Sequence, residues 1–455
     1  MSTRDPQQPA PAAAPITEWE GYGFDTRQVH AGEYADRNSG LRVPPIALSA
    51  GYVFEDFEDG VDRFAGRSVD PIYSRQGNPT NAVAEARLAS LEGGTAAVAV
   101  SSGQAAISAA LFALAGSGDH IVSTASIYGG TRILFGRSFQ RFGIDVDYVW
   151  DLDDDDEWDR AITPRTRAIY TESIPNPRND VVDLQRVARV AARYGLPVVV
   201  DNTVATPALL RPFEHGAHIV VHSTTKFLTG HGAAVGGAVV DGGTFDWSGT
   251  DRPYPLVTAP PRPGLSSLLD RFGDRAYARA VREAVVNDIG PSLSPFNGFL
   301  LQQGMETLSL RMERHVDSSI AIAEWLEQQP EIEAVDYAGL PSNALHALAM
   351  RDYGGRTGSV FGVTVRGGRA GARAFIDGLR IFSRMTGIGD TRSMAIHPAT
   401  STHATFAPEI NERLGITEGL VRLSVGIETA ADLIADLRGA LDRVADAIPA
   451  NRSAS

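Results

Sequence analysis

The sequence contains no cysteine, and this absence excludes several kinds of chemistry at once. Disulfide bonds, thiolate nucleophiles and cysteine metal sites all need that side chain. Long apolar runs are missing too: none approaches the ~20 residues that span a bilayer, and the first residues lack the basic-then-apolar order of a secretory signal. We therefore expect a cytoplasmic protein without a membrane partner.

Basic residues are fewer than acidic ones: the sequence has 41 Lys and Arg residues and 55 Asp and Glu residues. The formal net charge of −14 comes without the basic stripe that a nucleic acid would need, so we expect no nucleic-acid partner. The acidic run DLDDDDEWD (151–159) lacks the spaced glycine and terminal glutamate of an EF-hand calcium loop. We interpret it as a solvated loop, since blocks of like charge usually lie in water.

The length of 455 residues and the apolar share of 43% are enough for two domains. Residues 1–17 are rich in Pro, Ala and Gln and poor in bulky apolar groups, which predicts a disordered tail. Between residues 91 and 240, helical patterns alternate with short apolar runs such as TAAVAV, LPVVVD and HIVVHS. That alternation predicts a mostly parallel sheet covered by helices on both faces.

The chain changes character after residue 242. A looser stretch from 242 to about 295 is rich in Pro and Gly and includes RPYPLVTAPPRPG (252–264), which is predicted to be loop or linker. A long helical pattern, FNGFLLQQGMETLSLRMERHVDSSIAIAEWLEQ, follows it, and then come the apolar runs SVFGVTV and LVRLSVG. This order predicts a smaller α/β domain from about residue 291 to the end.

Polar residues follow several of the predicted strands of the first domain. Ser101–Gln104 opens a helix after TAAVAV, Asp201 ends LPVVVD, and Lys226 follows HIVVHS. In a parallel sheet, ligands bind beyond the carboxyl ends of the strands, so these residues can converge. Each has an ordinary interpretation as a turn, a cap or a surface charge. Together they offer a phosphate cradle, a carboxylate and a lysine, which are the needs of a pyridoxal-phosphate (PLP) site.

Three histidines offer a competing metal hypothesis. His218 and His222 share one face of a strand by the period of two, and His215 precedes them. We expect no acidic ligand beside them and therefore favour packed or surface histidines over a metal site.

Six motifs occur in order along the chain: YSRQGNPT (73–80), SLEGGTAAVAVSSGQAAI (90–107), SIYGGT (126–131), TESIPNP (171–177), VVVDNTVATP (198–207) and VHSTTKFLTGHG (221–232). With them, the chain from about residue 23 to residue 441 resembles the Cys/Met-metabolism PLP enzymes. The resemblance implies fold type I, the aspartate-aminotransferase-like α/β fold with a mostly parallel sheet in a large domain and a smaller C-terminal domain. The implied order is an N-terminal arm that reaches the neighbouring subunit (18–77), a PLP-binding domain (78–290) and a C-terminal domain (291–455).

The resemblance also implies roles for residues at the cofactor ring. Lys226 would bind PLP covalently and then act as a base. Asp201 would hold the pyridine nitrogen protonated, which makes the ring an electron sink. Tyr128 would stack on the ring face and assist as an acid or base, although a core aromatic is the plainer interpretation.

Further matched positions concern the cofactor phosphate. The resemblance places Ser102, Gly103 and Gln104 at this phosphate through the start of their helix, and Ser223 and Thr225 through their hydroxyl groups.

The remaining matched positions concern a neighbouring subunit and the substrate. Tyr73 and Arg75 would reach the phosphate from that subunit, which would make a homo-oligomer, a dimer or a tetramer, necessary for activity. Arg422 would clamp the carboxylate of a small amino-acid substrate. Asn176 and Ser393 would lie near that carboxylate and the cofactor ring.

Within the family, GGAVVDGGTFDW (236–247) and GDTRSMAIHPATSTH (389–403) resemble the O-acetylhomoserine sulfhydrylase branch. The implied reaction is a γ-replacement: O-acetyl-L-homoserine and sulfide, or methanethiol, give L-homocysteine, or L-methionine, and acetate. The alternative is a PLP-dependent γ-lyase acting on methionine or cystathionine. Three departures from the branch, at 260–267, at His218 and within SMAIHPATSTH, leave the acyl group and the nucleophile open.

Overall fold

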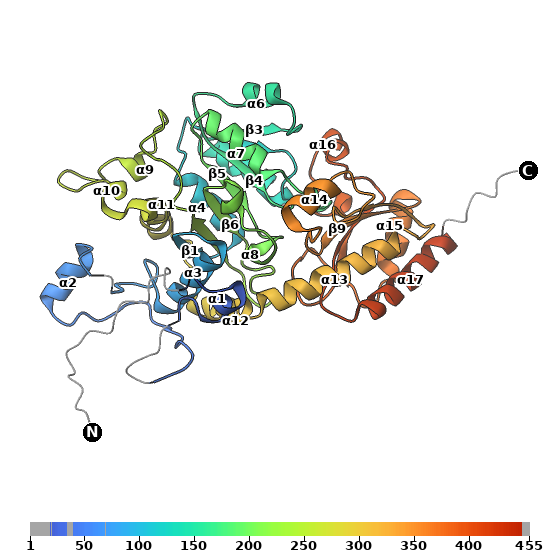
Figure 1. Ribbon diagram of the computed structural model, residues 1–455, viewed down its shortest axis with the longest axis horizontal. Helices are drawn as coiled ribbons and strands as arrows, with labels where there is room; N and C mark the ends of the chain where they lie inside the picture. Colours follow the sequence, from blue (N-terminus) through green and yellow to red (C-terminus); the bar gives the residue numbers. More distant parts are fainter. Residues whose placement is uncertain (1–18, 20, 34–39, 69, 448–455) are drawn as a thin grey trace, which may run out of the picture.

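The computed structural model describes residues 19, 21–33, 40–68 and 70–447, so the predicted tail at 1–17 lies outside the described residues. The chain folds around two sheets, a larger one and a smaller one, and the long helix α13 (Leu308–Leu326) runs from one part to the other (Figure 1). No helix within the described ranges is long and apolar enough to cross a membrane.

The large sheet has seven strands in the order β1-β7-β6-β5-β4-β2-β3. They are Ala96–Val100 (β1), His120–Thr124 (β2), Asp145–Val149 (β3), Thr166–Glu172 (β4), Val198–Asp201 (β5), Ile219–His222 (β6) and Gly237–Asp241 (β7). β7 is antiparallel to β1 and β6, and the other pairs are parallel. The expected mostly parallel sheet is confirmed, with β3 as an additional edge strand.

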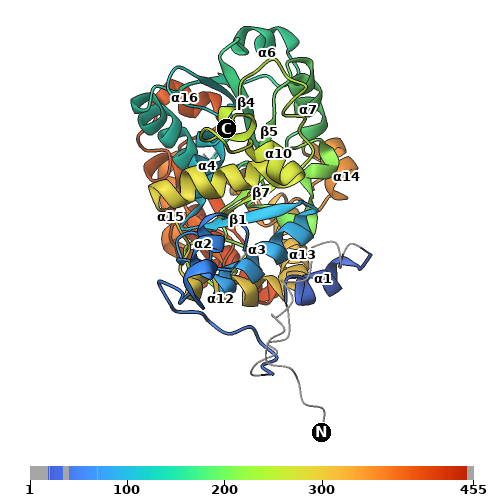
Figure 2. The same ribbon diagram turned by 90° about the vertical axis from the view of Figure 1, so that its left-hand side faces the viewer.

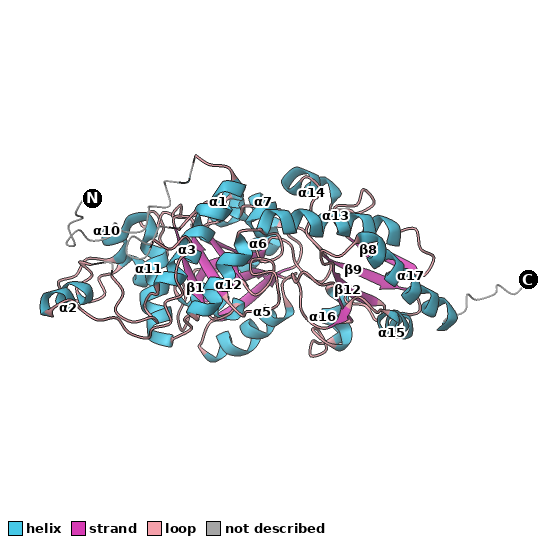
Figure 3. Cartoon of the chain, turned by 90° about the horizontal axis from the view of Figure 1, so that it is seen from below, coloured by secondary structure: helices cyan, strands magenta, loops and turns pink. Residues whose placement is uncertain are grey.

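Both faces of this sheet are covered by helices, as Figure 3 shows. Along β5, Val198 and Val200 belong to one hydrophobic core and Val199 belongs to the core on the other face. A strand buried on both sides needs apolar residues at every position, which explains the unbroken runs VVV and IVV. The rigid sheet therefore fixes the ends of its strands.

The helices around the large sheet begin and end at ordinary signals. Pro79 opens α3, Asn78 accepts the backbone N–H of Thr80, and Gly93 ends the helix at a φ of 82°. In the first half of the chain the helices are Phe24–His30 (α1), Phe57–Phe64 (α2), Pro79–Glu92 (α3), Gly103–Phe112 (α4), Gly129–Ile133 (α5), the π-helical Leu134–Phe139 (η2), Asp155–Ala161 (α6), Leu184–Arg193 (α7), Thr206–Leu209 (α8) and Pro212–His215 (η3). The acidic run predicted to be a loop thus provides the first turn of α6, with Asp154 as its cap.

The segment 252–264, predicted to be loop or linker, contains one short helix. The surrounding stretch from 242 to 295 is largely helical after residue 267. It contains Pro255–Thr258 (α9), Leu268–Phe272 (α10), Gly273–Arg275 (η4), Ala276–Ala280 (α11) and the π-helical Val281–Asn287 (η5). These helices pack on the large sheet and on α4, and the buried Tyr277 donates its hydroxyl to the carbonyl of Ala110. The Ala- and Val-rich residues after Ser267 outweigh the Pro and Gly signals before them.

The smaller sheet has the strand order β10-β11-β12-β9-β8. Its strands are Ile332–Asp336 (β8), Val360–Val365 (β9), Ser383–Arg384 (β10), Met394–Ile396 (β11) and Leu420–Ser424 (β12). The helices of this part are Pro295–Met305 (α12), Leu308–Leu326 (α13), His346–Tyr353 (α14), Gly368–Gly378 (α15), Pro398–Thr400 (η6), Pro408–Arg413 (α16) and Ala430–Ala447 (α17). The long helical pattern is therefore two helices. The first of them, α12, lies beside α3 of the large part (Figure 2).

Candidate active site

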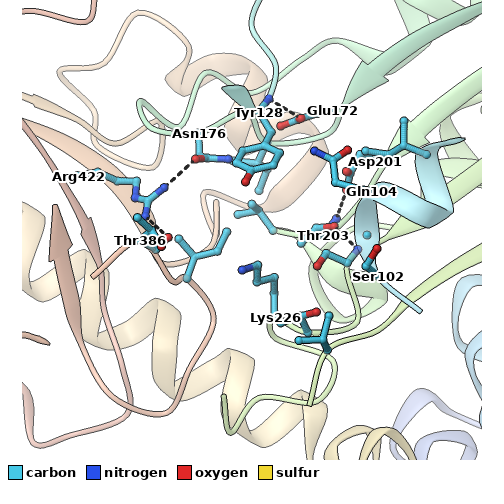
Figure 4. Close-up of a pocket in the computed structure, with 18 residues that line it drawn as sticks. Ser102, Gln104, Tyr128, Glu172, Asn176, Asp201, Thr203, Lys226, Thr386 and Arg422 are labelled. Atoms are coloured by element: carbon cyan, nitrogen blue, oxygen red, sulfur yellow. Dashed lines mark hydrogen bonds between the residues drawn. The ribbon is translucent and has the colours of Figure 1, made fainter. Parts of the chain in front are cut away.

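A cavity of about 250 Å³ lies where the carboxyl ends of β4, β5 and β6 meet residues of the smaller part. Figure 4 shows the side chains that surround it. They are Ser102, Gly103, Gln104, Ile107, Tyr128, Glu172, Ile174, Asn176, Asp201, Thr203, Val204, Ser223, Thr225, Lys226, Val235, Thr386, Ile388 and Arg422. The structure thus brings together ten of the thirteen predicted site residues.

Lys226 follows β6 in a tight turn, in which its carbonyl accepts the N–H of Gly230 at 2.7 Å. Burial, and then the positive charge of Arg422, lower the pKa of the Lys226 amine. No carboxylate of the described residues forms an ion pair with it. Lys226 is also the only lysine in the sequence, since every other basic side chain in the Lys and Arg count is an arginine. A buried amine with a lowered pKa is suited to Schiff-base chemistry.

Asp201 ends β5 and accepts the N–H of Thr203 at 2.9 Å and the hydroxyl of Tyr170 at 3.4 Å. Burial raises the pKa of this carboxyl, against the effect of the Thr203 hydrogen bond. None of the ion pairs within the described ranges includes Asp201. An enclosed carboxylate without a cationic partner fits a ligand that brings a positive charge of its own.

The end of the cavity at the start of α4 is suited to an anion. Ser102 caps α4 by accepting the N–H of Ala105, and Gly103 and Gln104 of its first turn line the cavity, where the free N–H groups of a helix start favour an anion. A Cβ atom at Gly103 would lie only 2.6 Å from Cβ of Ser223, so only glycine allows this close packing. These features fit a phosphate at the start of α4.

Thr225 lies at the same end, but its hydroxyl already donates to the carbonyl of Gly236 at 3.1 Å and accepts the N–H of Gly236 at 3.0 Å. The hydroxyl of Ser223 lies beside Gly103. A direct contact of either hydroxyl with a phosphate stays a prediction.

Tyr128 precedes α5, and its ring lies along one side of the cavity in Figure 4. Its backbone N–H donates to Oε1 of Glu172 at 2.6 Å. The side chain is 42% exposed, so its flat face is free to stack on a planar ligand. The alternative interpretation of Tyr128 as a core aromatic does not hold.

Arg422 on β12 brings a positive charge from the smaller part into the cavity lining. Its guanidinium donates to Oδ1 of Asn176 at 3.1 Å and to the carbonyls of Thr386 and Gly387 at 2.7 and 3.2 Å. Burial lowers the pKa of Arg422 to about 10, which still leaves it positively charged at neutral pH. No carboxylate of the described residues neutralises it, so the geometry fits the carboxylate of a ligand.

Three predicted residues lie outside the cavity lining. Ser393 is fully buried, and its hydroxyl donates to Oε2 of Glu428 at 2.9 Å, so the structure does not support its placement near the substrate. Tyr73 and Arg75 are exposed in this chain, and Arg75 donates to Oδ1 of Asn287 at 3.0 Å. Their role toward a neighbouring subunit stays a prediction.

The histidines form no metal site, and no group of three potential ligands occurs in the part of the chain that the structure describes. Nδ1 of His218 accepts the N–H of Val198 at 3.0 Å, and burial lowers the pKa of His218 to about 4. Nε2 of His222 lies 2.5 Å from Oε1 of Glu92, and both side chains are fully buried. Both histidines are packed, but the expectation of no acidic neighbour was wrong for His222, because Glu92 lies far from it in the sequence and next to it in the fold.

Eight of the lining residues were missing from the sequence prediction, among them Glu172, Thr203, Thr386 and Ile388. Glu172 ends β4 as Asp201 ends β5, so the same strand-end rule could have found it, and Thr203 follows Asp201 directly. Thr386 and Ile388 reach the cavity from the smaller part, and no local pattern marks them.

The comparison with protein families gives a match over residues 25–442 to the Cys/Met metabolism PLP-dependent enzymes. The chain belongs to this family. An O-acetyl-L-homoserine sulfhydrylase of Corynebacterium glutamicum is 44% identical over 92% of this chain and 96% of its own length. A homocysteine synthase of Schizosaccharomyces pombe is 42% identical over 93% of this chain and 99% of its own.

Solved structures agree with the family assignment. A crystal structure named for an O-acetylhomoserine (thiol)-lyase of Campylobacter jejuni, which contains N'-pyridoxyl-lysine-5'-monophosphate, has a TM-score of 0.88 and 34% identity, covering 92% of this chain and all of that chain. A cystathionine γ-lyase of Lactobacillus plantarum has a TM-score of 0.79 and 31% identity, covering 93% of this chain and 99% of that chain. Fold type I is confirmed, and PLP is the cofactor of the family.

The residues of this chain fit that cofactor. Lys226 would hold its aldehyde carbon, Asp201 its pyridine nitrogen, the start of α4 its phosphate and Tyr128 one face of its ring.

Proposed function

We propose that this enzyme catalyses a γ-replacement on O-acetyl-L-homoserine, in which sulfide or methanethiol displaces acetate and L-homocysteine or L-methionine forms. The observation that carries the proposal is the 44% identity, over 92% of the chain, with an O-acetyl-L-homoserine sulfhydrylase. The cavity supports it, because Lys226 and Arg422 both line the cavity, where the amine and carboxylate of an amino acid would need them.

The side chains of the cavity divide the work of this reaction. Arg422 binds the substrate carboxylate and so orients the Cα–H bond. Lys226 Nζ takes the Cα proton, and its lowered pKa leaves more of the amine free to do so. When bound, PLP supplies the electron sink that makes this proton removable. Proton transfer at Cβ, by Lys226 or by the hydroxyl of Tyr128, precedes the departure of acetate from Cγ.

The apolar residues Ile174, Val204 and Ile388 line the same cavity. They keep water from the reacting carbons after acetate has left, so that the thiol adds to Cγ. Return of one proton to Cβ and one to Cα completes the product.

A γ-lyase acting on methionine or cystathionine is the second candidate. The likeness to a cystathionine γ-lyase at a TM-score of 0.79 favours it. The absence of cysteine speaks mildly against a methionine γ-lyase, which typically uses a cysteine near the substrate. The two functions differ in what happens after the leaving group departs: a lyase releases a 2-oxo acid and ammonia.

The test is a comparison of kcat/KM for four reactions: O-acetylhomoserine with sulfide, O-acetylhomoserine with methanethiol, and cystathionine or methionine alone. The proposal expects one of the first two to exceed the last two by at least tenfold. A higher value for cystathionine or methionine would replace it with the lyase function. Lys226→Ala is the matched inactive control.

We also propose a homo-oligomer in which active sites are shared between subunits. In the predicted arm at 18–77, large apolar side chains are exposed on the single chain, among them Leu48 (71%), Val53 (92%), Phe57 (81%) and Phe64 (70%). Contiguous apolar exposure of this kind marks an interaction surface. Mixing inactive Arg75→Ala with inactive Lys226→Ala tests the sharing, because mixed oligomers should regain activity at sites built from one intact copy of each residue. No regain from verified mixed oligomers would contradict it.

A further inference from the structure

The cavity contains a second buried carboxyl group that the proposed chemistry does not use. Glu172 is the last residue of β4 and pairs directly with Asp201, the last residue of β5. Residues paired across adjacent strands point to the same face of a sheet. Both side chains line the cavity, and Glu172 is only 4% exposed. The carboxyl groups of Glu172 and Asp201 therefore lie next to each other in the cavity.

Glu172 has a specific contact on the opposite side from Asp201. Its Oε1 atom accepts the backbone N–H of Tyr128 at 2.6 Å (Figure 4). Tyr128 directly precedes α5, where a helix leaves its first N–H groups without backbone partners. Glu172 satisfies one of these groups and so fixes the point from which the Tyr128 ring extends.

The ring position depends on that point. The ring lies against Gly130, where an added Cβ atom would be only 2.4 Å from Tyr128 Cε1. A shift of the Tyr128 backbone would therefore move the ring relative to both Gly130 and the cavity. The contact between Glu172 and Tyr128 acts on the residue that faces the cofactor ring.

The two acids differ in the number of hydrogen bonds that they accept. Asp201 accepts two hydrogen bonds, from Thr203 and Tyr170. Glu172 has no cationic partner in the described ranges, and burial together with the charge of Asp201 raises its pKa well above the ordinary value. The other titratable groups that line the cavity are Tyr128, Lys226 and Arg422. Like charges at adjacent strand ends repel each other, so we expect only one of the two carboxyl groups to be ionised. The additional hydrogen bond favours the negative charge on Asp201.

We propose that Glu172 is a positioning residue that works as a neutral carboxylic acid: it holds Tyr128 over the cavity through the N–H contact and leaves Asp201 as the single negative charge at the strand ends. This inference rests on the proposed function only in that Tyr128 and Asp201 face the bound cofactor.

The test compares E172Q with E172L in the purified enzyme. Glutamine keeps a neutral oxygen acceptor for the Tyr128 N–H, and leucine has a similar size without one. We expect E172L to bind PLP roughly tenfold more weakly and to lose kcat more than KM changes, since a buried N–H is left unpaired. We expect E172Q to recover most of both losses. The readouts are the dissociation constant of PLP from the apoprotein, followed by tryptophan fluorescence, and kcat and KM with O-acetylhomoserine and sulfide.

A spectroscopic measurement tests the neutral form directly. The infrared spectrum of the holoenzyme should contain the carbonyl band of a protonated carboxylic acid at neutral pH, and E172Q should lose it. This readout keeps the proposal testable even where E172L fails to fold.

Glu157 provides a matched control outside the cavity. Its carboxylate accepts the N–H groups of Trp150 and Asp151 at 2.9 and 3.0 Å. Glu157→Leu should lower the thermal midpoint without changing the PLP dissociation constant. Three results would each overturn the proposal. E172Q could be as impaired as E172L, E172L could bind the cofactor normally, or the infrared carbonyl band could be unchanged in E172Q. A wild-type protein that binds PLP but makes no homocysteine overturns the proposed function instead, while the comparison of cofactor binding still stands.

Discussion

Replacement of Arg422 separates substrate binding from cofactor binding within one cavity. Its guanidinium is enclosed, carries its charge at neutral pH, and is held by Asn176 and by two backbone carbonyls. All of these partners are neutral, so the charge remains available for a carboxylate. Truncating one side of a buried charge pair costs ~2–5 kcal/mol, or a loss of roughly 30-fold to 5,000-fold in affinity.

We therefore expect Arg422→Ala to raise KM for O-acetylhomoserine within that range and to leave the PLP dissociation constant nearly unchanged. Arg422→Lys should bind substrate roughly tenfold more weakly than wild type, because a lysine keeps the charge but loses the planar fork. Steady-state kinetics and a PLP titration measure both quantities. Arg373→Ala on α15, whose side chain is 84% exposed, is the control. Loss of PLP with unchanged KM would refute the reasoning and show that Arg422 is structural.

Three further predictions concern other parts of the molecule. Borohydride reduction of the holoenzyme should label Lys226 once per chain, and Lys226→Ala should lose both label and activity; since the sequence has no other lysine, retained side-chain label in that variant would contradict the assignment. Asp201→Asn should keep PLP bound but lower kcat by at least a hundredfold, because the ring nitrogen loses its anionic partner; kinetics at saturating cofactor check this, and a kcat near wild type would exclude the role. Burial lowers the pKa of His315 to about 4 from 6.5, so the folded state resists its protonation and loses stability as pH falls below 6.5, with a cost of about 2 kcal/mol at pH 5. Urea unfolding of wild type and His315→Phe at pH 7 and pH 5 measures it, and a difference between them that does not change with pH would contradict the prediction.

The convergence of Asp201 and Lys226 could be predicted because Asp201 ends one buried apolar run and Lys226 follows another within four residues. Parallel strands end at one edge of a sheet, so a local pattern in the sequence translates into neighbouring positions in space. The place of the start of α4 could be predicted in the same way, because it follows β1, although β1 itself pairs antiparallel with β7.

Other features depend on contacts that no local pattern records. The hydroxyl of Ser393 donates to Glu428, 35 residues further along the chain, and Ser393 is not among the residues that line the cavity. Thr386 and Ile388 reach the site through the packing of the smaller part against the larger one. The helices between 242 and 295 were missed because Pro and Gly near the start of that stretch obscured the Ala- and Val-rich residues that follow.

The contact of Glu172 with Tyr128 shows the same limit at the site itself. The motif TESIPNP contains the residue, but the register of β4 against β5 decides that its carboxyl lies next to Asp201. The hydrogen bond to Tyr128 then joins two segments 44 residues apart in the sequence. Neither the register of β4 against β5 nor this hydrogen bond can be predicted from the local sequence.

The fate of O-acetylhomoserine with and without sulfide tests the central claim most directly. Homocysteine, acetate, 2-oxobutanoate and ammonia are measured together over the same time course. Homocysteine should accumulate nearly in step with acetate when sulfide is present, and 2-oxobutanoate should form only slowly when it is absent, because the apolar side chains of the cavity keep water from the reacting carbons. Formation of 2-oxobutanoate and ammonia without sulfide as fast as homocysteine forms with it would contradict the account and identify a lyase.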